Sequence, residues 1–183
     1  MENNFKMFLF LLATSLFCNN ETVAQNKRMV KSKSYHLILQ KLLKHDVPEI
    51  SVDSLNKINN AVLFLDARET EEFNVSHLKN AKWVGYKNFT INTIQNINKS
   101  KPIVVYCSVG YRSEKITEKL IAAGFTNVQN LYGGIFEWKN RKQDVYNENG
   151  ITNDVHPYNS TWSLWLKNEN KVYQSSNSIM QKK

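Results

Sequence analysis

One stretch near the middle of the chain joins an apolar run to a helical run through a loop that carries a thiol, a glycine and an arginine. Residues 103–106 are β-branched or aromatic and follow Pro102, which predicts a buried strand. Residues 113–123 place apolar side chains at helical spacing and end before Gly124, which predicts a helix. A buried strand followed directly by a helix is the repeating unit of a parallel sheet, so the predicted fold class is α/β.

The loop between these elements, Cys107 to Ser113, has the composition of an anion site with a nucleophile. A loop that leaves a parallel strand and begins a helix points backbone N–H groups and the positive end of the helix dipole at one place. These groups and the guanidinium of Arg112 stabilise a thiolate, which is the reactive form of cysteine. Gly110 allows positive φ and lets the backbone close around a ligand. We therefore predict that Cys107 is a nucleophile and not a core thiol.

The loop resembles the active loop of the rhodanese family of sulfurtransferases, which runs C-x-x-G-x-R-S as residues 107–113 do here. Two further stretches are similar to the first and last signatures of that family: Leu65-Asp-Ala-Arg68 with Glu72-Phe73 and Ser76-His-Leu78, and Leu131-Tyr-Gly-Gly134 with Trp138. The resemblance covers residues 50–142. It implies a doubly wound, mostly parallel sheet of about five strands flanked by helices.

The resemblance implies sulfur transfer from a small anionic donor such as thiosulfate to a thiol or a cyanide-like acceptor, through a persulfide on Cys107. Arg112 is then expected to act with Cys107 in catalysis, as a clamp on the anion. The substrate-binding loop would consist of Ser108, Val109, Gly110, Tyr111 and Ser113. No cofactor and no metal is expected, because no cluster of metal-ligating residues is recognisable in the sequence.

Two alternatives remain open at this point. One is a rhodanese-like module that binds sulfur or an anion with little turnover. The other is a cysteine-dependent phosphatase or arsenate reductase, whose loops place five residues between Cys and Arg. The four residues between Cys107 and Arg112 favour sulfur chemistry.

Asp66 is expected to support the active loop, because it and Cys107 both follow strands whose carboxyl ends meet at the ligand-binding edge of a doubly wound sheet. Arg68 is expected beside it, with a structural role and an i, i+4 ion pair to Glu72. We weigh a structural and a chemical role for Asp66 equally.

Residues 1–24 have the pattern of a signal peptide. Lys6 precedes an apolar run over residues 7–17, which is too short to span a bilayer, and small residues end at Ala24. Cleavage there predicts an exported, periplasmic protein that begins at Gln25 and lacks a transmembrane segment. A lipoprotein anchored at Cys18 is the alternative, and the bulky Phe17 argues against it.

The remaining segments flank the predicted domain. Residues 25–49 contain an apolar stripe that predicts an amphipathic helix. Residues 143–183 form a tail that is expected to be partly docked, with disorder from Asn168 onward. Within the domain, residues 89–97 are predicted to be helical. The net charge is +8, but the lysines are scattered and no nucleic-acid module is recognisable, so no nucleic-acid partner is expected.

Overall fold

The computed structural model describes residues 29–58, 61–167 and 169–174. The predicted signal peptide, Cys18 and the cleavage site at Ala24 lie outside these residues. Among the described residues, none of the helices combines the length and the apolar character that crossing a bilayer requires.

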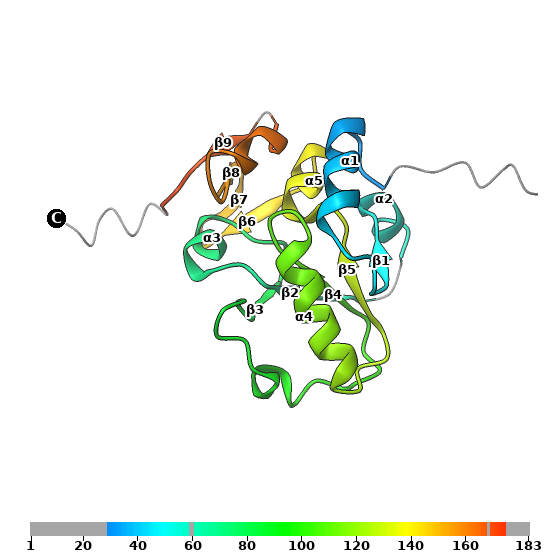
Figure 1. Ribbon diagram of the computed structural model, residues 1–183. Coiled ribbons are helices and arrows are strands. Elements are labelled where there is room, and N and C mark those ends of the chain that lie inside the picture. The colour runs from blue at the N-terminus through cyan, green and yellow to red at the C-terminus, as the bar shows by residue number, and fades with distance from the viewer. Residues whose placement is uncertain (1–28, 59–60, 168, 175–183) are drawn as a thin grey trace, which may run out of the picture.

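The described chain forms an α/β fold around one five-stranded parallel sheet (Figure 1). The strand order is β1-β5-β4-β2-β3, and all four pairings are parallel. The strands are β1 (Glu49–Ile50), β2 (Leu63–Asp66), β3 (Lys82–Trp83), β4 (Ile103–Tyr106) and β5 (Val128–Leu131). This architecture confirms the predicted fold class.

Five α-helices and a 3-10 turn connect or flank these strands: α1 (Lys33–Leu42), α2 (Val52–Leu55), α3 (Thr70–Val75), η1 (Ile91–Ile94), α4 (Tyr111–Ala122) and α5 (Gly134–Asn140). The ends of the short helices are defined locally. Ser51 caps α2 by accepting a hydrogen bond from the Ser54 N–H at 3.1 Å. Glu69 and Glu72 form a capping box at the start of α3.

The side chains of β4 alternate between two apolar layers, as expected for a strand that is covered on both faces. Ile103 and Val105 pack on the α4 side with Ile116 and Leu120. Val104 and Tyr106 pack on the other side, with buried residues of α1, α2 and α5, namely Tyr35, Leu39, Val52, Leu55, Ile135 and Phe136. The completely buried central strand therefore fixes where the loop after it emerges.

The segment after α5 packs against the domain. It contains a hairpin of β6 (Val145–Asn147) and β7 (Gly150–Thr152), a parallel pair of β8 (Asp154–Val155) and β9 (Asn170–Lys171), and the 3-10 turn η2 (Trp162–Trp165). Val155 and Leu166 join the core cluster beside α1 and α5. Trp165 stacks on Tyr35 with ring centroids 5.3 Å apart. β8, in orange in Figure 1, lies beside α3.

Two local expectations are wrong. Residues 89–97 form only the short turn η1, because this stretch is rich in asparagine, threonine and β-branched isoleucine, which are weak helix formers. Asn170–Lys171, in the tail that was expected to be disordered, forms a strand because its backbone pairs with β8.

Candidate active site

Cys107 directly follows β4 and lies beside the end of β2, where Asp66 is paired with Tyr106. Only 1% of the Cys107 residue is exposed. The N–H of Gly110 donates a hydrogen bond to Sγ of Cys107 at 3.1 Å. Gly110 has a φ of +116°, a conformation that a residue with a Cβ rarely adopts. This glycine therefore allows the backbone of the loop to turn around the sulfur.

The loop amides are available to a ligand. The carbonyl oxygens of Cys107 and Ser108 accept hydrogen bonds from the Ile135 and Phe136 N–H groups of α5, at 2.9 and 3.1 Å. In a planar trans peptide the N–H points away from the preceding carbonyl, so the amides of Ser108 and Val109 point away from α5. Within the described part of the chain, neither these two amides nor the N–H groups of Tyr111 and Arg112, the first two residues of α4, have a hydrogen-bond partner. This is the arrangement of an anion cradle.

The close approach of α5 to the loop depends on Gly134. A Cβ on this residue would lie 2.3 Å from the carbonyl oxygen of Cys107 and 2.7 Å from that of Ser108. Gly134, which belongs to the last of the two signatures, thus lets α5 begin directly against the Cys107 loop.

Arg112 lies in the first turn of α4 and forms a two-pronged ion pair with Glu72 of α3. Its Nη1 and Nη2 donate to the two carboxylate oxygens at 2.6 and 2.7 Å, and Nη2 also donates to Ser108 Oγ at 2.9 Å. Ser108 Oγ donates to the same carboxylate at 2.7 Å. The fork that was expected to hold a donor anion therefore holds Glu72. This ion pair ties the loop to α3, and the expected role of Arg112 in catalysis stays a prediction.

The charges of this pair stabilise each other. Burial raises the pKa of Glu72, but the hydrogen bonds and charge of Arg112 outweigh it and lower the pKa to about 2. Burial lowers the pKa of Arg112, and the bond to Glu72 overcomes this and raises it above its ordinary value. Both groups are therefore ionised near neutral pH.

Asp66 and Arg68 form a second buried ion pair. Arg68 is fully buried, and its Nη2 donates to Asp66 Oδ2 at 2.7 Å and to the carbonyl oxygen of Ser76 at 2.6 Å. Asp66 Oδ1 also accepts the backbone N–H of Arg68 at 2.9 Å. The expected pairing of Arg68 with Glu72 is wrong, because the carboxylate of Asp66 is nearer and Glu72 faces Arg112. The pair therefore ties the end of β2 to Ser76, the residue at which α3 ends.

Ser113, the last residue of the predicted loop, stabilises the position of Gly110 through Asn130. Its hydroxyl lies 2.7 Å from Asn130 Oδ1, and Asn130 Nδ2 donates to the carbonyl oxygen of Gly110 at 3.1 Å. All three residues are buried. Asn130 of β5 thus holds the glycine that donates to the sulfur, and no local sequence pattern predicts this role.

Ser113→Ala should lower the free energy of unfolding by about 1–3 kcal/mol, because Asn130 Oδ1 would remain buried without its donor. Ser100→Ala is the matched control, since Ser100 also donates to an asparagine side chain but at the surface. We expect that control to stay within about 0.5 kcal/mol of the parent. Urea unfolding of the three proteins measures this difference, and equal midpoints would contradict a supporting role for Ser113.

A cavity of 380 Å³ opens over the loop. Most residues of its wall belong to the domain, whereas α1 and the C-terminal segment contribute three. The lining residues are Leu42 of α1, Tyr158 and Trp162 of the C-terminal segment, and Glu69, Tyr86, Lys87, Cys107, Ser108, Val109, Tyr111 and Arg112 of the domain. Val109 and Tyr111, predicted as loop residues, therefore do face the site. Leu42, Tyr86, Tyr158 and Trp162 were not anticipated, because nothing in the local sequence shows what they fold against.

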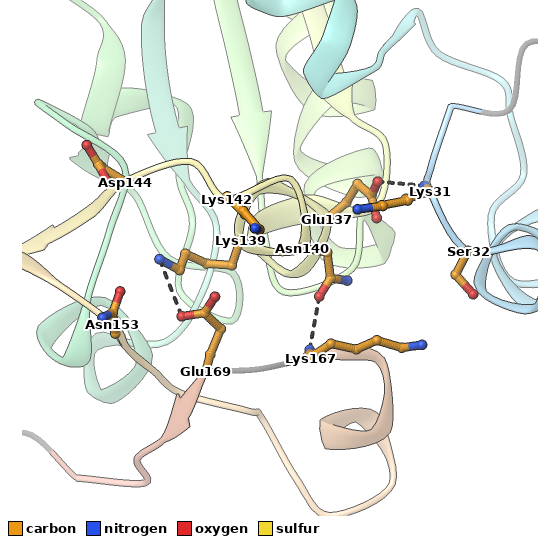
Figure 2. A pocket seen from close by; sticks show the side chains of 10 residues that line it. All are labelled: Lys31, Ser32, Glu137, Lys139, Asn140, Lys142, Asp144, Asn153, Lys167 and Glu169. Carbon is orange, nitrogen blue, oxygen red and sulfur yellow. Dashed lines mark hydrogen bonds and ion pairs between the residues drawn. The ribbon is translucent and has the colours of Figure 1, made fainter.

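A second cavity, of 540 Å³, lies between α5 and the C-terminal segment (Figure 2). Its lining residues include no cysteine, and several of its polar groups bond to one another. Lys139 pairs with Glu169 at 3.4 Å, and the Lys31 N–H donates to Glu137 at 2.7 Å. We therefore place the chemistry at the smaller cavity, which contains Cys107.

A group of three carboxylates, Asp46, Glu114 and Glu118, is close enough together to be considered as a metal site. Glu114 already accepts the N–H groups of Lys44 and His45, and Lys115 pairs with both glutamates. This cluster joins the end of α1 to α4 and gives no reason to assign a metal.

The fold and the site together define an α/β protein with a cysteine at the floor of an anion-binding loop, at the carboxyl end of a central parallel strand. The family model of the rhodanese-like domain matches residues 51–141. The chain therefore contains a rhodanese-like domain, as the loop and the two signatures predicted.

Curated relatives are similar to part of the chain. A tRNA uridine(34) hydroxylase of Pelagibacter ubique is 31% identical in an alignment of 145 residues that covers 68% of this chain and 48% of that protein. One of Photorhabdus laumondii is 34% identical in an alignment of 91 residues that covers 47% of this chain and 26% of that protein. The chain thus spans about half or less of the length of these relatives.

Among solved structures, the thiosulfate sulfurtransferase of Pseudomonas aeruginosa superposes with a TM-score of 0.50 at 19% identity, over 55% of this chain and 20% of that one. This likeness concerns the fold.

Proposed function

We propose that the protein is a sulfurtransferase that carries sulfane sulfur as a persulfide on Cys107. The observation that supports this most directly is the position of Sγ, which accepts the Gly110 N–H and lies beside loop amides without partners in the described chain. Such a cradle stabilises a thiolate and also the negative charge of a persulfide.

In the first half-reaction, the Cys107 thiolate attacks the outer sulfur of thiosulfate. A bond forms between the two sulfurs, the sulfur–sulfur bond of the donor breaks, and sulfite leaves with the bonding electron pair. The amides of Ser108 and Val109 stabilise the charge that develops. Lys87 at the cavity wall is exposed and attracts the anionic donor, since the charge of Arg112 is already balanced by Glu72.

In the second half-reaction, cyanide or a thiolate attacks the outer sulfur of the persulfide. The sulfur–sulfur bond breaks and Cys107 leaves as a thiolate, ready for another donor. Such double displacement gives ping-pong kinetics.

Incubation of the protein with thiosulfate should add the mass of one sulfur atom, located on the peptide that contains Cys107 and removed by cyanide. Mass spectrometry of the intact protein and of its peptides measures this. A binding module without turnover would show the adduct but no catalytic release of sulfite, and a protein that gains no sulfur would overturn the proposal.

The same spectra test our proposal that the protein is exported, because a periplasmic form should begin at Gln25 and a lipoprotein at a lipid-modified Cys18.

A phosphatase or arsenate reductase is a poorer fit. Both prongs of Arg112 are held by Glu72, so the guanidinium is not free to wrap a tetrahedral phosphate. Efficient hydrolysis of an aryl phosphate that depends on Cys107 would favour that chemistry instead.

The curated relatives supply a second candidate, hydroxylation of uridine 34 in tRNA. It is favoured by their similarity over residues that include the domain, and by aromatic side chains in the cavity, on which a base could stack. Nucleoside analysis of tRNA from cells with and without the protein distinguishes the two. Loss of a hydroxylated uridine without any persulfide on Cys107 would favour this second candidate.

A further inference from the structure

Three cavity residues come from outside the part of the chain that matches the rhodanese-like domain. Leu42 belongs to α1, and Tyr158 and Trp162 follow β8, whereas the family match covers residues 51–141. The domain alone would leave the Cys107 loop more open. The flanking segments of this chain therefore convert an exposed loop into a walled cavity.

The two aromatic residues of the tail are held in place by specific contacts. The ring of Tyr158 lies against the Arg112 guanidinium, 4.9 Å from ring centroid to Cζ. The Tyr158 N–H donates to Nδ1 of His156, a buried residue, at 3.0 Å. The Trp162 N–H donates to Asn159 Oδ1 at 3.0 Å. The tail thus positions aromatic surface beside the ion pair that shapes the active loop.

The cavity is larger and more apolar than thiosulfate or cyanide requires. At 380 Å³ it lies within the range of pockets that bind small organic molecules, of roughly 300–1,000 Å³. Thiosulfate and cyanide have only a few atoms and no apolar surface to bury. Leu42, Tyr86, Val109 and Trp162 instead present apolar or aromatic surface next to the sulfur.

We propose that the sulfur acceptor is a low-molecular-weight organic thiol with an apolar group about the size of a phenyl ring, and that Trp162 and Tyr158 determine this preference. The inference rests on the proposed sulfurtransferase function. The acceptor thiolate attacks the outer sulfur of the Cys107 persulfide, the sulfur–sulfur bond to Cys107 breaks, and an organic persulfide leaves. The apolar group packs against the tail during this step.

The test begins from protein that has been loaded with sulfur by thiosulfate and then freed of donor. Discharge of the persulfide is followed with 2-phenylethanethiol and with 2-mercaptoethanol, and each rate is corrected for the thiolate concentration. We expect the phenyl thiol to react at least about tenfold faster, since burial of one ring contributes about that much. In Trp162→Ala the ratio should fall to about two or less. Leu164→Ala is the matched control, because Leu164 lies in the same turn and is 70% exposed, and it should keep the parent ratio.

Equal rates for the two thiols in fully loaded protein would overturn the inference and leave the proposed function standing, whereas a failure to load would overturn both. An unchanged ratio in folded Trp162→Ala would also overturn it. A second measurement needs no variant: 2-phenylethanol, which has no thiol, should compete with 2-phenylethanethiol for the loaded parent protein. Absence of competition would exclude a site for the ring.

Discussion

Replacement of Cys107 by serine should reduce sulfur transfer from thiosulfate to cyanide by at least about a thousandfold, because the chain loses the nucleophile that carries the sulfur between the two half-reactions. A hydroxyl remains protonated at neutral pH and cannot form the persulfide. Steady-state release of thiocyanate and the mass of the protein after incubation with thiosulfate measure the two consequences.

The serine variant is nearly isosteric, so its melting temperature should stay close to that of the parent. Cys107→Ala serves as a second variant in which no oxygen can interfere, and it should be equally inactive. A sulfur adduct that persists in either protein would place the carrier elsewhere and contradict the mechanism.

Replacement of Glu72 by glutamine should have the largest effect on stability. The carboxylate balances the charge of Arg112 and accepts bonds from both Arg112 and Ser108. An amide group supplies no charge and turns an N–H donor toward the guanidinium. Removing one partner of a buried pair costs about 3–5 kcal/mol, which corresponds to a fall of roughly 10 °C in the melting temperature.

Turnover of Glu72→Gln should also fall by at least about tenfold, since Ser108 and Arg112 are parts of the active loop. Glu71→Gln is the matched control, because Glu71 is the neighbouring glutamate of α3 and is exposed. It should behave like the parent in both assays. A Glu72 variant as stable as the Glu71 variant would mean that the ion pair has no net effect on stability.

The same pair predicts how stability depends on pH. The pKa of Glu72 is lowered in the folded protein to about 2 from an ordinary 4.5. Its contribution to stability is therefore complete above about pH 4.5 and is lost as the pH falls from there toward 2. The loss amounts to about 3 kcal/mol over that interval. Urea unfolding at a series of acidic pH values should show a shallower decline in Glu72→Gln than in the parent protein.

The sequence was informative where neighbours in the chain are also neighbours in space. The strand before Cys107, the loop and the helix after it follow from local patterns, and the structure differs by beginning α4 at Tyr111 and ending it at Ala122. The choice of ion-pair partners could not be predicted in this way. Glu72 is one helical turn from Arg68 in sequence, but the fold brings it to Arg112, and Arg68 turns back to Asp66.

The residues that the C-terminal segment contributes to the cavity wall could not be predicted, for a similar reason. The tail was expected to dock in part, but the positions of Tyr158 and Trp162 depend on contacts between segments that are distant in sequence, such as the pairing of β8 with β9 and the packing of Tyr158 on Arg112. Asn130 is likewise one of two polar residues in the four-residue strand β5, and only the structure shows that it bonds to Gly110.

The hydrogen bonds from α5 to the loop have a consequence for biosynthesis. A chain is synthesised from its amino terminus to its carboxyl terminus, so Cys107 leaves the ribosome before residues 134–140. These later residues bond to the carbonyl groups of the loop. Pairing of β1 with β5 must likewise wait until residues 128–131 have been synthesised. The nascent chain therefore passes through a period in which its thiol is neither buried nor cradled. We therefore expect the Cys107 thiol to be more accessible to oxidants during this period than in the folded protein.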